Sequence, residues 1–451
     1  MNVKQEKSHY LFDNKALMAL ILPLIIEQFL AVLVGMADSI MIASVGEAAV
    51  SGVSLVDQVM LLIINLFGAL ATGGAVVAGQ YLGRKNPEEA DKAANQLIWF
   101  VTILAVGVMG LVYLGKNMIL QGVFGQIEPD VMEYANTYLL IVTASVPFIA
   151  LYNGGAAIFR TMGNSKITMT VSLIMNAINV VGNAILIYGF HCGVEGVAIP
   201  TLVSRMTAAI LITVLLLNEK QVLHLQKTLR YRPEKETIKK ILKIGIPNGL
   251  ENSMFQLGKV LVLSLVSTFG TYAIAANAVC NVLASFQILP GMALSLAVTT
   301  VISRCVGAKD YEQVSYYTKK LLAISYISMF VTTIVICVAL PFIMDVYNLS
   351  PETAKVAEEI MIFHSVSCVL IWTPAFTLPS TLRAAGDAKT CMLISIPCMW
   401  IFRIGFSYIL GKYFGMGVFG VWVAMVIDWV VRVIFFVLRY CRGKWKTIRT
   451  I

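Results

Sequence analysis

The chain has 451 residues, of which 58% are hydrophobic and only 13% charged, and its mean hydropathy is +0.80. A soluble protein of this length cannot bury that much apolar surface, so the composition indicates an integral membrane protein. The formal net charge of +9 does not indicate nucleic-acid binding, because the basic residues collect in the short loops between apolar segments. The eight cysteines contain no CxxC motif and predict no disulfide framework.

Twelve apolar segments are long enough to cross a hydrocarbon core of about 30 Å as helices. We interpret the first as a retained helix rather than a signal peptide, because no short apolar region with a small-residue cleavage site precedes it. The predicted spans are residues 16–44, 50–81, 93–115, 130–159, 166–190, 194–217, 240–268, 274–305, 316–343, 354–381, 390–412 and 417–439.

The basic residues predict how these spans are oriented. Most of the 34 Lys and Arg residues fall in segments on the same side as the N-terminus, whereas the opposite loops hold only Lys116, Lys355 and Lys412. Loops rich in Lys and Arg remain in the cytoplasm. We therefore expect a multi-pass protein of the plasma (inner) membrane, with both termini in the cytoplasm.

The basic, polar stretch from Asn218 to Lys243 is the one long linker, and it lies at the middle of the chain. A search for an internal repeat across this linker finds matches in nearly one register over the full length. Such agreement is hard to obtain by chance and indicates a duplication. The matching pairs include Pro23 with Pro247, Glu27 with Glu251, Gly46 with Gly270, Gly83 with Gly307, Arg160 with Arg383 and Gly163 with Gly386.

The repeat predicts the architecture. An even number of spans in each copy gives both copies the same orientation, so a pseudo-twofold axis along the membrane normal relates them. We predict an all-α integral membrane protein with twelve transmembrane helices in two six-helix lobes around a central cleft, as in transporters. The expected domains are an N-lobe over residues 1–217, a cytoplasmic linker over 218–239 and a C-lobe over 240–451.

Asp38 is a carboxylate inside the first apolar segment. An ionised side chain there costs about 3 kcal/mol or more, so it is by default a functional-site hypothesis. Asn183 and Thr201 lie at a similar depth, about 10 Å below the outer surface at 1.5 Å per residue. Asn179 lies one turn deeper, on the same helix face as Asn183. One carboxylate, two amides and a hydroxyl suit Na⁺, with Asp38, Asn179 and Asn183 as its ligands, whereas Asp38 alone could carry a proton. The alternative is a hydrogen-bonded cluster that only joins helices.

The repeat also provides a test of these four residues. Polar positions in the first half are apolar in the second, which symmetric scaffolding would not require. We infer that ion coupling is confined to the first half. The aligned pairs are Asp38 with Val262, Asn179 with Phe402, Asn183 with Phe406 and Thr201 with Met425.

Two further carboxylates, Glu27 and Glu251, are repeat mates that each lie four residues after a proline, roughly 15 Å from the inner surface. They could attract cationic compounds or form an inner gate. Alternatively, each one, when protonated, satisfies backbone groups freed by the proline. A pair between Arg403 and Asp428 is also expected. The candidate substrate-cleft residues are Glu27, Glu251, Gln28, Gln256, Tyr152 and Asn153.

Four motifs carry a resemblance to a known family, and the resemblance extends over the whole chain. The chain resembles the multidrug and toxic compound extrusion (MATE) family, of the bacterial NorM/DinF-like type. The resemblance implies cation-coupled export of amphipathic, often cationic, organic compounds by alternating access, with roles for the Asp of span one and the polar pair of span five. The motifs are LPLIIEQ (22–28) leading into Met36-Ala37-Asp38, FRTMGN (159–164), IPNGLE (246–251) and LRAAGD (382–387).

The chain departs from the NorM-type pattern at two carboxylates. That branch has a glutamate about eight residues after the proline of span seven, where this chain has Phe255. It also has a carboxylate in span ten, where residues 361–381 contain none. The resemblance therefore gives no second-lobe coupling site.

We predict a Na⁺- or H⁺-driven antiporter that exports amphipathic cations, works as a monomer, and needs no cofactor beyond the coupling ion. The alternative is a flippase of a lipid-linked precursor, which would need clustered basic residues to hold a diphosphate. In or near the spans, the chain has only Arg205, Lys259, Arg403 and Arg432. An enzyme is not expected, because the sequence contains no HExxH, no GxSxG and no His/carboxylate cluster with metal spacing.

Overall fold

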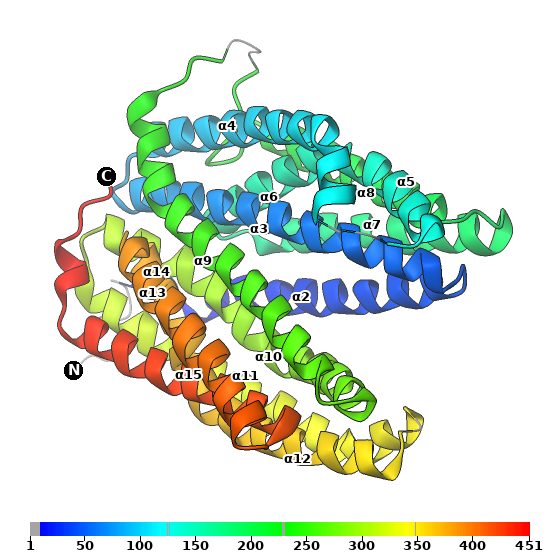
Figure 1. Ribbon diagram of the computed structural model, residues 1–451. Helices are drawn as coiled ribbons and strands as arrows, with labels where there is room; N and C mark the ends of the chain where they lie inside the picture. The colour runs from blue at the N-terminus through cyan, green and yellow to red at the C-terminus, as the bar shows by residue number, and fades with distance from the viewer. Residues whose placement is uncertain (1–9, 124, 126, 228–230, 348) are drawn as a thin grey trace. The chain divides into compact units, whose positions relative to one another are not determined.

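The computed structural model describes residues 10–451 except 124, 126, 228–230 and 348. The described residues form helices joined by short turns, with no strand among them (Figure 1). In the first half these helices are α2 (Asn14–Ala43), α3 (Glu47–Gly83), α4 (Pro87–Leu114), α5 (Pro129–Thr143), α6 (Val146–Thr161), α7 (Ser165–Ala184) and α8 (Glu195–Leu216), with π-helical turns η2 (Met118–Val123) and η3 (Ile185–Gly189).

The second half has the same succession of long helices, interrupted by more π-helical segments. Its helices are α9 (Lys235–Ser267), α10 (Thr271–Gly307), α11 (Tyr311–Val346), α12 (Pro351–Ser367), η4 (Cys368–Thr377), α13 (Leu378–Ala384), α14 (Ala388–Pro397), η5 (Cys398–Gly405), η6 (Tyr408–Tyr413) and α15 (Gly417–Cys441), followed by the short 3₁₀ helix η7 (Lys444–Thr447).

Ten helical stretches of the described residues are long and apolar enough to cross a membrane, and the bent pair α5 and α6 makes an eleventh. This pair bends by 47°, at a point just before Pro147, which cannot donate a backbone hydrogen bond. The remaining predicted span is α9, which is 33 residues long but more polar because it carries Glu251 and Lys259. With α9 included, the helices follow the twelve predicted spans in number and order.

Contacts within the chain define two compact units, and we call Asn14–Gly249 the N-unit and Leu250–Thr450 the C-unit. The boundary falls inside α9, so the first part of this helix belongs to the N-unit. There its Gly245 lies against Gly73 of α3, so closely that a Cβ on Gly73 would reach the backbone of α9. The described residues before Asn14 belong to the C-unit, where the backbone N–H of Phe12 donates to the Tyr317 hydroxyl at 2.8 Å.

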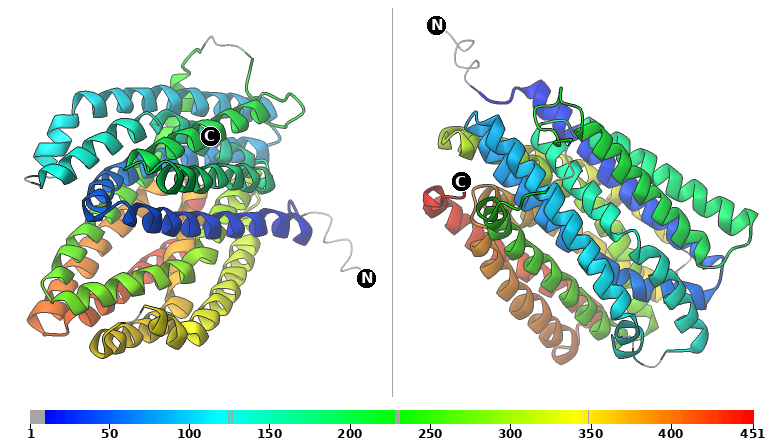
Figure 2. Two further views of the ribbon diagram at one scale, coloured as in Figure 1. Left: turned by 90° about the vertical axis from the view of Figure 1, so that its right-hand side faces the viewer. Right: turned by 90° about the horizontal axis from the view of Figure 1, so that it is seen from above.

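In the N-unit, α2 packs along α7, α7 packs along α8, and α3 packs against α4, α5 and α6 (Figures 1 and 2). The contact between α7 and α8 is close because Gly182 has no side chain: a Cβ at this position would lie 2.8 Å from the Cβ of Pro200. The three helices α2, α7 and α8 therefore approach one another near the residues predicted for ion coupling.

The two halves repeat unusual backbone conformations at matching positions. Gly163 and Gly386 have φ angles of 85° and 96°, in the left-handed region that glycine tolerates. Lys85 and Lys309, which are also repeat mates, have φ angles of 59° and 57°. The same turns thus connect corresponding helices in each half, as expected for an internal duplication.

Candidate functional site

The four residues predicted for ion coupling meet in the N-unit. Asp38 lies near the C-terminal end of α2, Asn179 and Asn183 lie one turn apart near the C-terminal end of α7, and Thr201 lies in the first turns of α8. Because α2 and α8 both pack on α7, these ends come together. Asn179, Asn183 and Thr201 are buried, and Asp38 is half-buried.

Hydrogen bonds join the four side chains into one cluster. The Asn183 amide nitrogen donates to Asp38 Oδ1 at 2.6 Å. The Asn179 amide nitrogen donates to the Thr201 hydroxyl at 3.1 Å, and that hydroxyl donates to the backbone oxygen of Val197 at 2.8 Å. The cluster is thus held from both sides of α7.

One buried oxygen of the cluster is left without a partner in the described part of the chain. The buried Oδ1 of Asn183 has no hydrogen-bond partner among the described residues. This unmatched oxygen, close to the Asp38 carboxylate, is the kind of ligand that a hard monovalent cation takes.

The Asn179 amide finds partners for both of its polar atoms when it is turned. Its nitrogen then donates to Asp38 Oδ1 at 2.8 Å and Oδ2 at 3.3 Å, and its oxygen accepts from the Thr201 hydroxyl at 3.1 Å. Amide nitrogens from both asparagines of α7 then hold the Asp38 carboxylate.

A second group of charged residues near Asp38 was missed by the sequence analysis. Asp57 on α3 accepts a hydrogen bond from the Tyr138 hydroxyl at 3.0 Å, and Arg205 on α8 donates to the Ser145 hydroxyl at 2.8 Å. Asp57 and Arg205 are the charged groups whose electrostatic effect reaches Asp38. With all three groups ionised, two carboxylates and one guanidinium have one formal negative charge in excess in this part of the N-unit.

A signal for Asp57 was present in the sequence. It lies inside the second apolar span, so the argument that singled out Asp38 applies to it as well. Its repeat mate, Asn281, is also polar, so the comparison of the two halves does not single it out.

Glu27 and Glu251 each pair with an arginine of their own unit. Glu27 lies 3.8 Å from Arg160 and also accepts from the Thr168 hydroxyl at 3.1 Å. Glu251 lies 2.7 Å from Arg383. Both glutamates and both arginines are repeat mates, so the duplication has preserved a buried ion pair, an arrangement that neither sequence interpretation of the glutamates included.

The remaining predicted cleft residues do not form one cluster. Tyr152, on α6, is buried, and Glu27 is among the charged groups that act on it. Gln28 and Asn153 in the N-unit, and Gln256 in the C-unit, are half-buried. Their side chains make no hydrogen bond within the described part of the chain, so they are available to a ligand but not held for one.

In the C-unit, aromatic rings occupy the positions that match the asparagines of α7. Phe402 and Phe406 stack with their ring centroids 5.7 Å apart. The pair expected between Arg403 and Asp428 was wrong: Asp428 instead pairs at 2.8 Å with Arg432, one turn along α15. A spacing of four residues on one helix places such side chains together.

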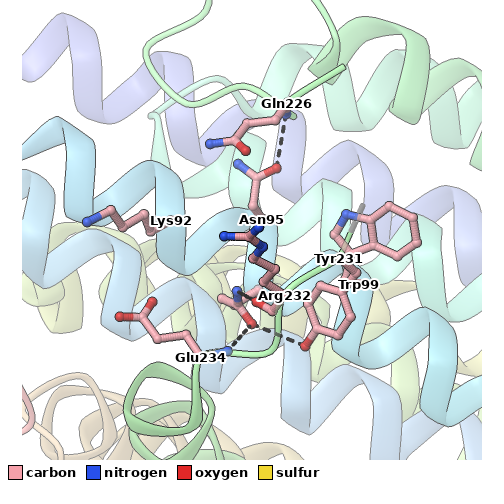
Figure 3. Close-up of a pocket in the computed structure, with 8 residues that line it drawn as sticks. Lys92, Asn95, Trp99, Gln226, Tyr231, Arg232 and Glu234 are labelled. Carbon is pink, nitrogen blue, oxygen red and sulfur yellow. Dashed lines mark hydrogen bonds between the residues drawn. The ribbon is translucent and has the colours of Figure 1, made fainter. Parts of the chain in front are cut away.

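A pocket of about 340 Å³ lies between α4 and the segment that follows α8 (Figure 3). Asn95 accepts from the backbone of Gln226 at 3.0 Å, and Gln96 accepts from the Tyr231 hydroxyl at 3.1 Å. Because α4 starts where α3 ends, this pocket is at the opposite end of the spans from Asp38. These contacts fasten the linker to α4. The lining residues are Lys92, Asn95, Gln96, Trp99, Gln226, Tyr231, Arg232 and Glu234.

Gly182 offers a test of how α8 is placed against α7. We expect Gly182→Leu to push Pro200 away and separate Thr201 from Asn179, because the space for a side chain is absent. Transport should fall by about tenfold or more, while Gly107→Leu, at a position with no atom within 4 Å, should transport like the wild type. Initial rates of dye efflux, normalised to protein in the membrane, measure the difference. Equal rates for the two variants would contradict this role of Gly182.

The fold and the polar cluster together define a class: a multi-pass helical membrane protein, internally duplicated, with buried charge in its spans. The comparisons with known proteins narrow this class. The family model MatE matches residues 23–185 and 247–409, one match in each half. The chain therefore belongs to the MatE family, whose members are membrane transporters.

Similar proteins extend over nearly the full length. The chain is 26% identical over 440 residues to the uncharacterized transporter YisQ of Bacillus subtilis, covering 95% of this chain and 94% of that protein. It is 25% identical over 443 residues to the probable multidrug resistance protein NorM of Thermotoga maritima, covering 96% and 93%. A solved structure described as the outward-facing conformation of a multidrug resistance MATE family transporter of the MOP superfamily has a TM-score of 0.90 at 22% identity, covering 96% and 97%.

These findings confirm the resemblance inferred from the motifs and the all-α, twelve-span, two-lobe fold class. They also confirm a multi-pass membrane protein. A transporter family of this kind handles small molecules across a bilayer, and it is not a family of enzymes.

Proposed function

We propose that this protein is a cation-coupled antiporter that exports amphipathic, often cationic, organic compounds by alternating access. It works as a monomer in the plasma membrane, with both termini in the cytoplasm, since the basic loops lie on that side. Relatives that carry the name of multidrug resistance proteins support the substrate class. The coupling ion is Na⁺ or H⁺.

The observation that carries this proposal is the oxygen-rich cluster around Asp38, in which one buried oxygen has no partner among the described residues. The Asn183 Oδ1 atom is buried without a partner, and the Asn179 amide can turn its oxygen toward the carboxylate. A proton would need only the carboxylate, whereas Na⁺ would use the amide oxygens and the Thr201 hydroxyl as well. The number of oxygens therefore favours Na⁺.

The residues of the cluster have a specific task in each state. When no ion is bound, the amide nitrogens of Asn183 and Asn179 hold the Asp38 carboxylate. When a cation is bound, Asn179 presents its oxygen instead, and this exchange links α2, α7 and α8 to occupancy of the site. The one excess negative charge among Asp38, Asp57 and Arg205 matches one monovalent cation.

Imposing ion gradients separately tests the coupling. In vesicles that contain the protein, we expect an inward Na⁺ gradient at equal pH to drive ethidium efflux, and a pH gradient without Na⁺ to drive at most about a tenth of that rate. Fluorescence of the dye reports the flux, and vesicles without the protein are the control. Efflux that follows only the pH gradient would assign the coupling to protons, and efflux that needs neither gradient would contradict cation coupling.

A further inference from the structure

Two basic side chains in the membrane-spanning part of the C-unit converge on one aromatic ring. The Nζ atom of Lys259, on α9, lies 5.0 Å from the centroid of the Phe255 ring. The Cζ atom of Arg403, on η5, lies 5.2 Å from the same centroid. Two helices far apart in the sequence therefore bring two positive charges to one place.

Neither cation forms an ion pair within the described residues. The charge of Asp428 reaches Arg403, but its Oδ1 accepts from Arg432 at 2.8 Å. Glu251 pairs with Arg383 at 2.7 Å. Within the described residues, the side chains of Lys259 and Arg403 make no hydrogen bond and no ion pair. The other arginines of the spans each have a partner: Arg160, Arg205, Arg383 and Arg432.

Both side chains are too deep to be ordinary interfacial residues. Lys259 lies eight residues before the end of α9, about 12 Å along the helix, and Arg403 lies about 15 Å from the end of its span at Tyr413. Cations at such depth are rare in membrane helices and normally pair with a counter-charge. An unpartnered pair at this depth needs another reason to be kept.

Contact with Phe255 does not supply that reason. The free energy gained from a cation–π contact is smaller than the cost of placing an unpaired cation in the membrane. Here the two like charges also repel each other. A single cation would pack on the ring at lower cost. The arrangement becomes favourable when an anion lies between the two charges.

The internal repeat shows that the two cations are not a structural feature common to both halves of the chain. Lys259 and Arg403 align with Gly35 and Val180 of the N-unit, which carry no charge. The N-unit has an excess of negative charge around Asp38, whereas the C-unit has an excess of positive charge at the matching level of its own helices. The two units therefore favour ions of opposite sign.

We propose that Lys259, Arg403 and Phe255 form an oxyanion-binding site that takes the carboxylate or phosphate of an amphipathic organic compound. Arg403 offers a planar donor pair that fits two oxygens of such a group, Lys259 adds a second charge, and Phe255 contacts the adjacent apolar part. The site rests on the proposed function only in assigning the bound compound as cargo. It extends the substrate class to amphipathic acids and zwitterions.

Matched probes of opposite charge test the site without any transport. We expect the purified full-length protein in lipid nanodiscs, in chloride-free buffer, to bind 1-naphthylacetate in equilibrium dialysis, and 1-naphthylmethylammonium serves as the probe of opposite charge. Lys259→Met and Arg403→Met should each weaken binding of the acid by about tenfold or more without weakening binding of the amine. Lys259→Arg, which keeps the charge, should retain binding of the acid. Unchanged binding of the amine by Lys259→Met shows that its loss of acid binding is not misfolding.

Two further experiments with the same assay distinguish a lipid phosphate from a small organic anion, and distinguish failure of the anion site from failure of the proposed transport function. Displacement of 1-naphthylacetate by farnesyl diphosphate, but not by acetate, would assign the site to a lipid-borne phosphate, whereas displacement by 1-naphthyl phosphate alone would assign it to a small organic anion. Asp38→Asn should bind the acid like the wild type even if it transports nothing. The inference is overturned if the acid does not bind, or if both methionine variants bind it like the wild type.

Discussion

Replacing Asp38 with asparagine is expected to reduce cation-driven efflux of ethidium or norfloxacin to the level of vesicles that lack the protein. The substitution keeps the shape of the side chain, and its oxygen can still accept the hydrogen bond that Asn183 donates at 2.6 Å. Only the charge that attracts a coupling cation is removed, so the driving gradient can no longer act through this site. Initial efflux rates under an imposed gradient, with protein abundance in the membrane determined by immunoblot, measure the effect.

The adjacent residue provides a matched control. Ser39 is exposed, and its hydroxyl donates only within its own helix, to the backbone oxygen of Gly35 at 2.9 Å. Ser39→Ala should therefore transport like the wild type. Full activity of Asp38→Asn at normal abundance would overturn the ion site, whereas loss of the protein from the membrane in Asp38→Asn alone would show that the cluster only holds the helices together.

The sequence predicts residues whose position along a helix is enough to define their role. Asp38, Asn179, Asn183 and Thr201 were identified because depth follows from residue number at 1.5 Å per residue, and because their repeat mates are apolar. The structure brings all four into one hydrogen-bonded cluster. Depth alone does not say which helices are neighbours, and this is where sequence reasoning stopped.

The group formed by Asp57, Tyr138 and Arg205 illustrates that limit. These residues come from three helices, α3, α5 and α8, and only the packing of the N-unit brings them near Asp38. The site of Arg205 also depends on the break between α5 and α6, since its partner Ser145 lies at that break. We predicted one continuous span over 130–159, so the buried break that receives Arg205 was not expected.

The buried pairs of glutamate with arginine could have been inferred from the internal repeat, which aligns both partners, but not from helix periodicity. The same shift that matches Glu27 with Glu251 nearly matches Arg160 with Arg383, yet the two arginines were used only as evidence of the repeat. Contact between the first and fourth spans of each unit depends on tertiary packing, which the sequence pattern does not reveal. By contrast, the pairing of Asp428 with Arg432 follows from a spacing of four residues and could have been predicted.

Removing Arg383 is expected to have the largest effect on stability. Arg383→Met leaves the buried Glu251 carboxylate without the guanidinium that lies 2.7 Å away, and breaking such a pair costs about 3–5 kcal/mol because a buried charge remains uncompensated. The unfolding transition of the purified protein in detergent, followed by intrinsic tryptophan fluorescence during heating, should shift to lower temperature. The exchanged variant Glu251→Arg/Arg383→Glu should recover part of this loss, because it restores one charge of each sign.

The repeat mate supplies a graded comparison for the same measurement. Arg160 lies farther from Glu27, at 3.8 Å, and Glu27 keeps a hydrogen bond from the Thr168 hydroxyl at 3.1 Å when Arg160 is removed. Arg160→Met should therefore lower the unfolding temperature less than Arg383→Met does. If the two variants lose equal stability, the shorter distance between Glu251 and Arg383 does not make that ion pair the more stabilising of the two. If neither variant loses stability, the glutamates must have access to water, because a buried charge cannot be left unpaired at no cost. The pairing found in both units would then serve movement of the helices rather than their packing.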